Sequence, residues 1–217
     1  MERESMSTAE LRDALVAAGR RVVDLGLSPG SSGNLSIKDN GSLYMSPTGV
    51  QLGGLDADQL SVISPAGEQI GGAKASKELP LHAAMYQKDP AARAVLHLHS
   101  PQATAASCLV PHTSHSALPA VTPYLVMRVG RVPHVPYAPP GSVDLGERIL
   151  DVTGAFHGAL LANHGLIVSG ETFDQAIDRA IEIEESCRIY RELFGLPAQW
   201  LSDEQARQLS HTYGTHW

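Results

Sequence analysis

Apolar residues recur along the chain at two spacings, one typical of helices and one typical of strands. From Leu11 to Leu25 they follow helical spacing, directly after Ser7-Thr8-Ala9-Glu10, which has the form of a capping box. Gly26 then ends this predicted helix. By the same signals we expect further helices over 78–87, 101–109, 142–152, 172–194 and 202–209.

Short apolar runs separated by turn residues predict the strands. Asn40-Gly41 is a strong hairpin signal between two such runs, and Ala66-Gly67 is a second candidate. The expected strands are 35–37, 43–45, 60–63, 69–70, 94–99, 159–162 and 166–169, with 133–137 as an extended edge because of its prolines. Since helices alternate with hairpins, we expect an α/β or α+β fold with a largely antiparallel sheet.

Length and composition narrow the class of protein. A chain of 217 residues with 43% hydrophobic residues fits one domain over residues 1–217. Its net charge is −7 and its lysines and arginines form no run, which argues against a nucleic-acid groove. No apolar run approaches the ~20 residues of a membrane span. Glu2, Arg3 and Glu4 leave no apolar signal core at the start, so we expect a cytoplasmic protein.

The sparse use of cysteine also favours a cytoplasmic location. Cys108 and Cys187 form no short-range pairing motif, and such sparse usage fits a reducing environment. We interpret both as small buried hydrophobic residues.

The histidines carry the first candidate site. His97 and His99 follow an apolar run, and on a strand residues i and i+2 point to the same face. Two neutral imidazoles at one place suit a metal ion, although such a pair also occurs as two half-buried strand histidines. His164, in a turn beside Gly165, is the candidate third ligand. Three histidines with an open fourth position are typical of catalytic zinc.

Other histidines have ordinary alternatives. His82 lies four residues after Glu78 on one predicted helix face, so it is either a partner of the site or a simple helix-face residue. The remaining six have no partner evident in the sequence, and we expect most of them to be solvated: His112, His115, His134, His157, His211 and His216.

Three loops of small residues form the second candidate site. They are Ser32-Gly33-Asn34, Thr48-Gly49 and Ala75-Ser76-Lys77. Free backbone N–H groups and hydroxyls suit a phosphate, and the start of a helix favours an anion. Each loop alone is also an ordinary turn.

Together these motifs resemble the class II aldolase/adducin family, which contains L-fuculose-1-phosphate aldolase. The resemblance extends from about Leu11 to Tyr213 and rests on five ordered motifs: SSGNLSI (31–37), SPTGV (46–50), ASKELPLHAAMY (75–86), AVLHLHSPQATAAS (94–107) and LLANHG (160–165). It implies a three-layer α/β/α fold with a central, mainly antiparallel sheet. It also implies a homotetramer with active sites at subunit boundaries.

The same resemblance implies the roles of individual residues. His97, His99 and His164 match ligands of Zn²⁺ or another divalent ion, and Glu78 matches the catalytic glutamate. The phosphate-binding positions match Asn34, Thr48, Gly49 and Ser76. Tyr124, after a one-residue shift, matches a tyrosine that reaches the neighbouring site, and Tyr213 matches a C-terminal active-site tyrosine.

One departure from the aldolases bears on the substrate. Fuculose aldolases have Ser-Ser-Glu where this chain has Ser76-Lys77-Glu78, and this triplet with residues 122–137 resembles the 3-oxo-tetronate 4-phosphate decarboxylase branch. We therefore expect a zinc-dependent carbon–carbon lyase that forms dihydroxyacetone phosphate through an enediolate. Lys77 either binds the carboxylate or phosphate or is a solvated lysine at the start of a helix. The alternatives are an aldolase for a ketose 1-phosphate, a sugar-phosphate epimerase or dehydratase, and a non-catalytic adducin-like interaction module.

Overall fold

Eight strands form one sheet in the order β4-β3-β2-β1-β5-β8-β7-β6, in a computed structural model that describes residues 7–217. Every neighbouring pair is antiparallel except β6 and β7, which are parallel. The strands are β1 (Asn34–Asp39), β2 (Ser42–Met45), β3 (Ser61–Ile63), β4 (Gln69–Gly71), β5 (Ala94–Leu98), β6 (His134–Val135), β7 (Gly158–Leu161) and β8 (Gly165–Gly170). The predicted hairpins and the predicted edge are therefore confirmed.

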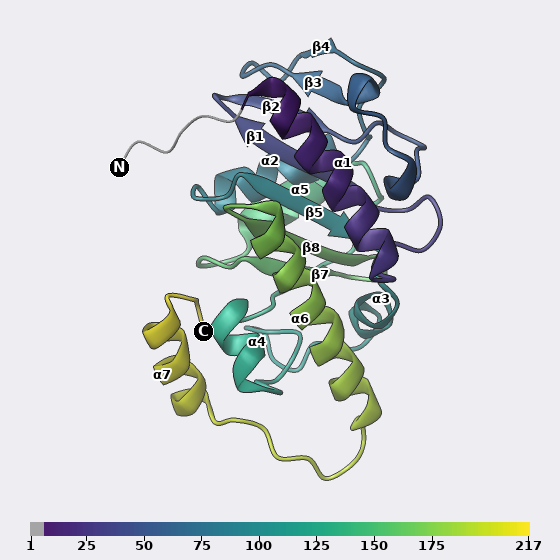
Figure 1. The fold of residues 1–217 in the computed structure, drawn as a ribbon. Helices are drawn as coiled ribbons and strands as arrows, with labels where there is room; N and C mark the ends of the chain where they lie inside the picture. Colours follow the sequence, from purple (N-terminus) through teal and green to yellow (C-terminus); the bar gives the residue numbers. More distant parts are fainter. Residues whose placement is uncertain (1–6) are drawn as a thin grey trace.

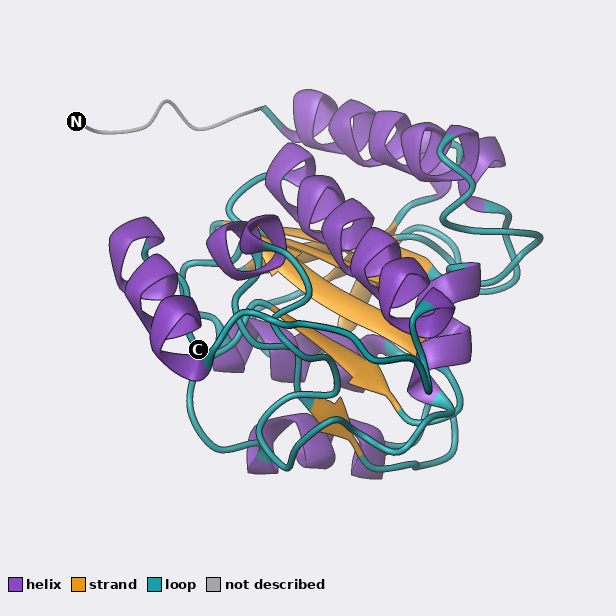
Figure 2. Cartoon of the chain, turned by 90° about the horizontal axis from the view of Figure 1, so that it is seen from below, coloured by secondary structure: helices purple, strands orange, loops and turns teal. Residues whose placement is uncertain are grey.

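Helices cover both faces of the sheet, which gives the expected three-layer α/β/α arrangement. α1 and α6 cross one face, and α2 and α5 lie behind the other (Figure 1). Seen from below, the strands lie between two layers of helices (Figure 2). The helices are α1 (Thr8–Asp24), α2 (Leu79–Lys88), α3 (Pro101–Ser107), α4 (Pro123–Arg128), α5 (Val143–Asp151), α6 (Phe173–Glu192) and α7 (Asp203–Tyr213), with short 3₁₀ turns at Leu52–Gly54 and Ala57–Gln59.

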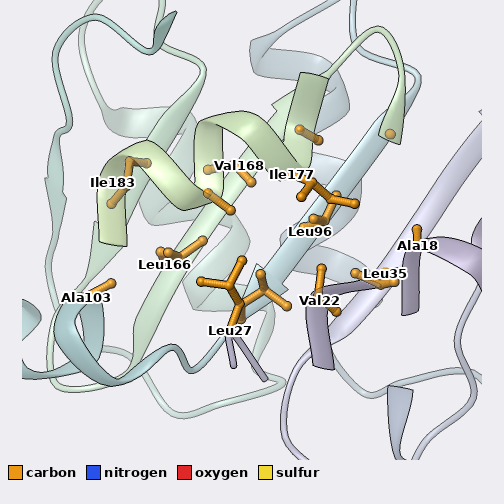
Figure 3. Close-up of a cluster of buried hydrophobic side chains, with 14 of the residues drawn as sticks. Ala18, Val22, Leu27, Leu35, Leu96, Ala103, Leu166, Val168, Ile177 and Ile183 are labelled. Atoms are coloured by element: carbon orange, nitrogen blue, oxygen red, sulfur yellow. The ribbon is translucent and has the colours of Figure 1, made fainter. Parts of the chain in front are cut away.

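The central strands are apolar on both faces because each face is covered. Leu96, Leu166 and Val168 pack against Ile177 and Ile183 of α6 (Figure 3). The alternate residues of the same strands, such as Val95 and Ile167, face α2 and α5. His97 is two residues after Val95 on β5, so its side chain points to the same face of the sheet, toward α2 and α5.

Capping residues fix where several helices begin. Ser7 and Glu10 form the predicted capping box of α1, and Thr172 accepts a hydrogen bond from the backbone N–H of Gln175 at the start of α6. A second capping box, Ser202 with Gln205, starts α7.

The ends of several helices differ from the prediction. α3 ends at Ser107 rather than at 109, because the backbone N–H groups of Cys108 and Leu109 bond carbonyl oxygens three residues back, as in a 3₁₀ turn. α7 continues to Tyr213, where Gly214 ends it with φ of 70°. α4 was not predicted, because its six residues are too few to show a period, although Thr122 caps it.

One further expectation, on the cysteines, is corrected, and another, on the first residues, lies outside the described part of the chain. Cys187 is buried as expected, but Cys108 is exposed at the end of α3, so its interpretation as a buried residue was wrong. Glu2, Arg3 and Glu4, on which the expectation about a signal core rests, lie outside the described residues. Among residues 7–217, no helix has the length and apolar character needed to cross a membrane.

Candidate active site

The three predicted histidines lie together at one end of the central strands. His97 is in β5, His99 follows the end of that strand, and His164 lies in the turn between β7 and β8. Their ring centroids are 4.7–4.8 Å apart in each pair, and the ring planes meet at 67–69°. The turn approaches the strand end closely, because a Cβ on Gly165 would lie 2.4 Å from the carbonyl oxygen of Leu98.

Burial holds these imidazoles neutral. Nδ1–H of His97 donates to the carbonyl oxygen of Leu166 at 2.9 Å, so the lone pair of Nε2 faces Nε2 of His99, also at 2.9 Å. Burial, with the charges of His164 and His99, holds the pKa of His97 well below its usual range. Burial also lowers the pKa of His99 and of His164.

Glu78 completes the cluster from the start of α2. It is 4% exposed, and its carboxylate lies 3.2 Å from Nε2 of His97 and 3.5 Å from Nε2 of His164. The four potential ligand atoms of Glu78 and the histidines lie within 4.8 Å of one another. Neutral imidazoles and a carboxylate at this separation fit a single divalent cation. In addition, Nδ1 of His164 is buried and has no hydrogen-bond partner among the described atoms.

A cavity of about 360 Å³ opens over this cluster, and we call it the Glu78 cavity. All of the predicted phosphate-binding residues line it, as do Lys77, His99 and His164. The full lining is Ser31, Ser32, Gly33, Asn34, Pro47, Thr48, Gly49, Ser76, Lys77, Glu78, His99, Pro140 and His164.

Backbone pairing brings two of the predicted loops together at the rim. The backbone N–H of Thr48 donates to the carbonyl oxygen of Lys74 at 3.0 Å, and Pro47 forms an isolated bridge with Ala75. The turn at Gly49 has φ of +77°, which glycine adopts without strain. Loops distant in sequence thus line one space with Thr48, Gly49 and Ser76.

Lys77 reaches the same cavity from an exposed position. Its methylene chain packs against Gly141, where a Cβ would lie 2.8 Å from its Cγ and Cδ. Burial is the largest cause of the lowered pKa of His99 and of His164, and the positive charge of Lys77 lowers both pKa values further. The ammonium is therefore near the histidine cluster.

The two predicted tyrosines do not join this group within the chain. Tyr124 lies on α4 and is 57% exposed, and Tyr213 lies at the end of α7 and is 53% exposed. Neither lines the Glu78 cavity. Their contribution to a neighbouring subunit stays a prediction.

The structure also shows a polar network that the sequence left open. Asn34 donates through Nδ2 to Glu78 at 2.8 Å, and its Oδ1 lies 2.5 Å from Nε2 of His82. His82 is fully buried, and burial with the charge of His97 lowers its pKa to about 3. Of the two alternatives for His82, contact with the site is thus the one observed. The spacing of Glu78, His82 and Tyr86 along one helix face was the signal for it.

Two other histidines are also paired rather than solvated. Nδ1 of His157 bonds the carboxylate of Asp89 at 2.9 Å, and Nε2 of His134 bonds the carbonyl oxygen of Ser107 at 3.0 Å. Both partners are distant in sequence, so no local pattern indicated them.

Comparisons with known proteins agree with this architecture. The family model "Class II Aldolase and Adducin N-terminal domain" matches residues 13–191. A 3-oxo-tetronate 4-phosphate decarboxylase of Pectobacterium atrosepticum is 40% identical over 205 residues, covering 94% of each chain. An L-fuculose phosphate aldolase of Haemophilus influenzae is 31% identical, covering 96% of this chain and 97% of its own.

A solved structure gives the same result for the fold. YgbL of Klebsiella pneumoniae, for which aldolase, epimerase and decarboxylase activities are named as candidates, superposes with a TM-score of 0.88. It is 38% identical, and the match covers 94% of this chain and 99% of that one. Fold, site geometry and relatives agree, and the chain belongs to the class II aldolase and adducin family.

Proposed function

We propose that this protein is a metal-dependent carbon–carbon lyase that decarboxylates 3-oxo-tetronate 4-phosphate to dihydroxyacetone phosphate. One observation supports this proposal most strongly. Glu78 and three neutral histidines come together beside the loops that contain the predicted phosphate-binding residues, and Lys77 lines the same cavity. The relatives at 37–40% identity named for this reaction support the choice of substrate.

The reaction breaks the bond between the carboxylate carbon and its neighbour. The electron pair moves toward the adjacent ketone oxygen and leaves an enediolate, which becomes dihydroxyacetone phosphate after one proton is added to carbon. His97, His99 and His164 would hold a divalent ion, which would supply Lewis-acid stabilisation of the developing oxygen charge. We assign zinc, because nitrogen ligands with an open position are typical of catalytic zinc.

Glu78 is the group that moves the proton. Its carboxylate lies at the floor of the Glu78 cavity, and Asn34 holds one of its oxygens through Nδ2 at 2.8 Å. A buried carboxylate fixed in this way is suited to general acid–base catalysis on a carbon atom above it.

The loops of small residues that line the Glu78 cavity bind the phosphate group, at the end of the substrate that does not react. Asn34, Thr48, Gly49 and Ser76 offer amide, hydroxyl and backbone donors to one space. Binding energy at the phosphate orients the bond that breaks at the other end of the substrate. Lys77, between these donors and Glu78, binds the carboxylate that leaves as carbon dioxide.

Aldol cleavage of a ketose 1-phosphate such as L-fuculose 1-phosphate is the second candidate. It leaves the same enediolate, and relatives at 31–33% identity are named as L-fuculose phosphate aldolases. An aldehyde leaving group needs a proton donor and acceptor at its oxygen, which Tyr124 of a neighbouring subunit could supply. Lys77 favours the decarboxylase, because carbon dioxide needs no such donor but its carboxylate must be bound.

The assembly and location complete the proposal. We propose a cytoplasmic homotetramer in which Tyr124 and Tyr213 of one subunit reach the Glu78 cavity of the next. Both tyrosines are exposed on the helices α4 and α7, which pack beside each other, as an inter-subunit role requires.

One assay separates the candidates. Zinc-loaded protein is incubated with 3-oxo-tetronate 4-phosphate and, separately, with L-fuculose 1-phosphate, while carbon dioxide, aldehyde and dihydroxyacetone phosphate are measured. We expect carbon dioxide and dihydroxyacetone phosphate in equal amounts from the first substrate. Aldehyde release from the second substrate alone would replace the decarboxylase with the aldolase, and no turnover of either would overturn both.

A further inference from the structure

A chain of buried polar side chains runs from Glu78 away from its cavity. Glu78 bonds Asn34 at 2.8 Å, Asn34 contacts His82 at 2.5 Å, and His82 contacts Ser36 at 2.7 Å. Ser36 in turn lies 2.9 Å from the hydroxyl of Tyr86. All five side chains belong to residues less than 9% exposed, so solvent does not compete for these bonds.

Two periodicities build this chain. Glu78, His82 and Tyr86 follow one another at four-residue intervals at the start of α2 and along it, and so share one face. Asn34 and Ser36 are two residues apart on β1 and share a face of the sheet. The polar residues of the helix therefore meet those of the strand in alternation.

Between Glu78 and Ser36 the hydrogens in this chain have a single direction, and beyond them the hydroxyl of Tyr86 donates to the carbonyl oxygen of Arg93 at 3.1 Å. Glu78 offers acceptors only, so Asn34 presents Nδ2 to it and turns Oδ1 toward His82. Nε2 of His82 must then carry the hydrogen, and Nδ1 is left to accept from the hydroxyl of Ser36. His82 is neutral, since burial lowers its pKa to about 3, so only one of its nitrogens carries hydrogen.

Reversal of the Asn34 amide would be unfavourable at both ends. Its carbonyl oxygen would face the carboxylate of Glu78, and its NH₂ group would face the N–H of His82. A buried contact of two acceptors or two donors leaves polar groups without a hydrogen bond, which is unfavourable. The imidazole thus selects one of the two amide orientations.

We propose that His82 is a positioning residue, whose Nε2–H holds the Asn34 amide with its NH₂ group toward Glu78 and thereby aligns the carboxylate for proton transfer. This inference rests on the proposed role of Glu78. His82 itself does not line the Glu78 cavity and acts only through Asn34.

Two amide substitutions at position 82 test this assignment. In His82→Gln the side-chain NH₂ reaches the place of Nε2 and keeps the bond to Asn34. In His82→Asn the shorter amide reaches only the place of Nδ1 and loses it. We expect His82→Gln to keep kcat within about threefold and His82→Asn to lower it roughly 10–100-fold, the range for outer partners of a site. Metal content should stay unchanged, and KM should change less than kcat.

A double-mutant cycle with Asn34→Ala shows whether His82 acts through the amide. In that background we expect the two variants at position 82 to have equal kcat, because the group they orient is gone. Equal activity of the two variants with Asn34 present, or losses that add fully to that of Asn34→Ala, would overturn the proposal.

The same cycle is measured in the free energy of unfolding of the metal-free protein in urea. We expect non-additive effects for positions 34 and 82, since the residues are in contact. This measurement needs no substrate. A wild-type protein inactive on both substrates would overturn the proposed function, whereas additive unfolding energies would overturn the His82–Asn34 pairing.

Discussion

Asn34 and His97 lie directly opposite each other on the antiparallel strands β1 and β5, with their side chains on the same face of the sheet. One of them bonds the carboxylate of Glu78, and the other lies 3.2 Å from it. The register of two strands therefore sets the position of the proposed acid/base relative to the candidate metal site.

Removal of one imidazole should empty the metal site. We expect His97→Ala to lose the divalent ion and all measurable turnover, because the remaining two histidines rarely hold a catalytic zinc. Metal content by elemental analysis and activity are the measurements. His211→Ala, an exposed position on α7, is the control and should keep both. Full metal occupancy with normal activity in His97→Ala would remove this residue from the site.

Neutralising the proposed acid/base should separate chemistry from binding. We expect Glu78→Gln to keep the fold and the metal while kcat falls roughly 10²–10⁴-fold, the usual contribution of a general acid–base group. Circular dichroism and metal analysis accompany the kinetics. Glu185→Gln, on the surface of α6, serves as the matched control. Turnover near the wild-type rate in metal-loaded Glu78→Gln would exclude Glu78 from the mechanism.

Lys77 distinguishes binding of the carboxylate from binding of the phosphate. If its ammonium binds the carboxylate, Lys77→Ser should lower decarboxylation at least tenfold, or ~1.4 kcal/mol, with little change in affinity for dihydroxyacetone phosphate. If it binds the phosphate, both should fall together. Lys74→Ser is the control, because Lys74 is exposed nearby but does not line the Glu78 cavity. Changes below about twofold in both quantities would make Lys77 a surface residue.

Mixed oligomers test whether active sites lie at subunit boundaries. In aldol cleavage of a ketose 1-phosphate, where the leaving aldehyde needs a proton donor, Tyr124→Phe and Glu78→Gln should each be inactive or nearly so as pure proteins. Unfolded and refolded together, they should regain activity at about a quarter of the boundaries, where one chain supplies the tyrosine and the next the glutamate. Activity is compared with that of the two pure proteins mixed without unfolding. No regain, with mixed oligomers verified by mass spectrometry, would place Tyr124 outside the site.

The stability of the metal-free protein should fall with acid in a way that depends on His82. Its pKa is lowered from 6.5 to about 3 by burial and by His97, so below pH 6.5 the unfolded chain binds a proton that the folded protein does not. Unfolding free energy then decreases as pH falls, by about 1 kcal/mol per pH unit for one proton. His82→Gln should show a shallower decrease between pH 6 and pH 4.5 in urea titrations. The same slope in wild type and variant would contradict a neutral buried His82.

Local patterns in the sequence predicted most of the helices and strands and most residues of the candidate site. Capping residues and periodic apolar positions predicted α1 and α6, and Asn40-Gly41 predicted the first hairpin, since these signals act between near neighbours. The His97-Leu98-His99 spacing was enough to place two imidazoles on one face. Turn residues indicated His164 and the three loops of small residues as candidates, and the motif resemblance then assigned them to one site, since no local rule connects them.

Which groups distant in sequence come into contact depends on the tertiary structure. The order of the sheet places β1 and β8 on either side of β5, and this brings Asn34 and the turn of His164 to His97. His82 and His157 form hydrogen bonds with residues of other elements. Residue spacing does not predict these bonds, because they depend on how the elements pack together. Hydrogen-bond direction and burial depend on these long-range contacts, so the orientation of Asn34 emerges only when the helix and the strand are packed together.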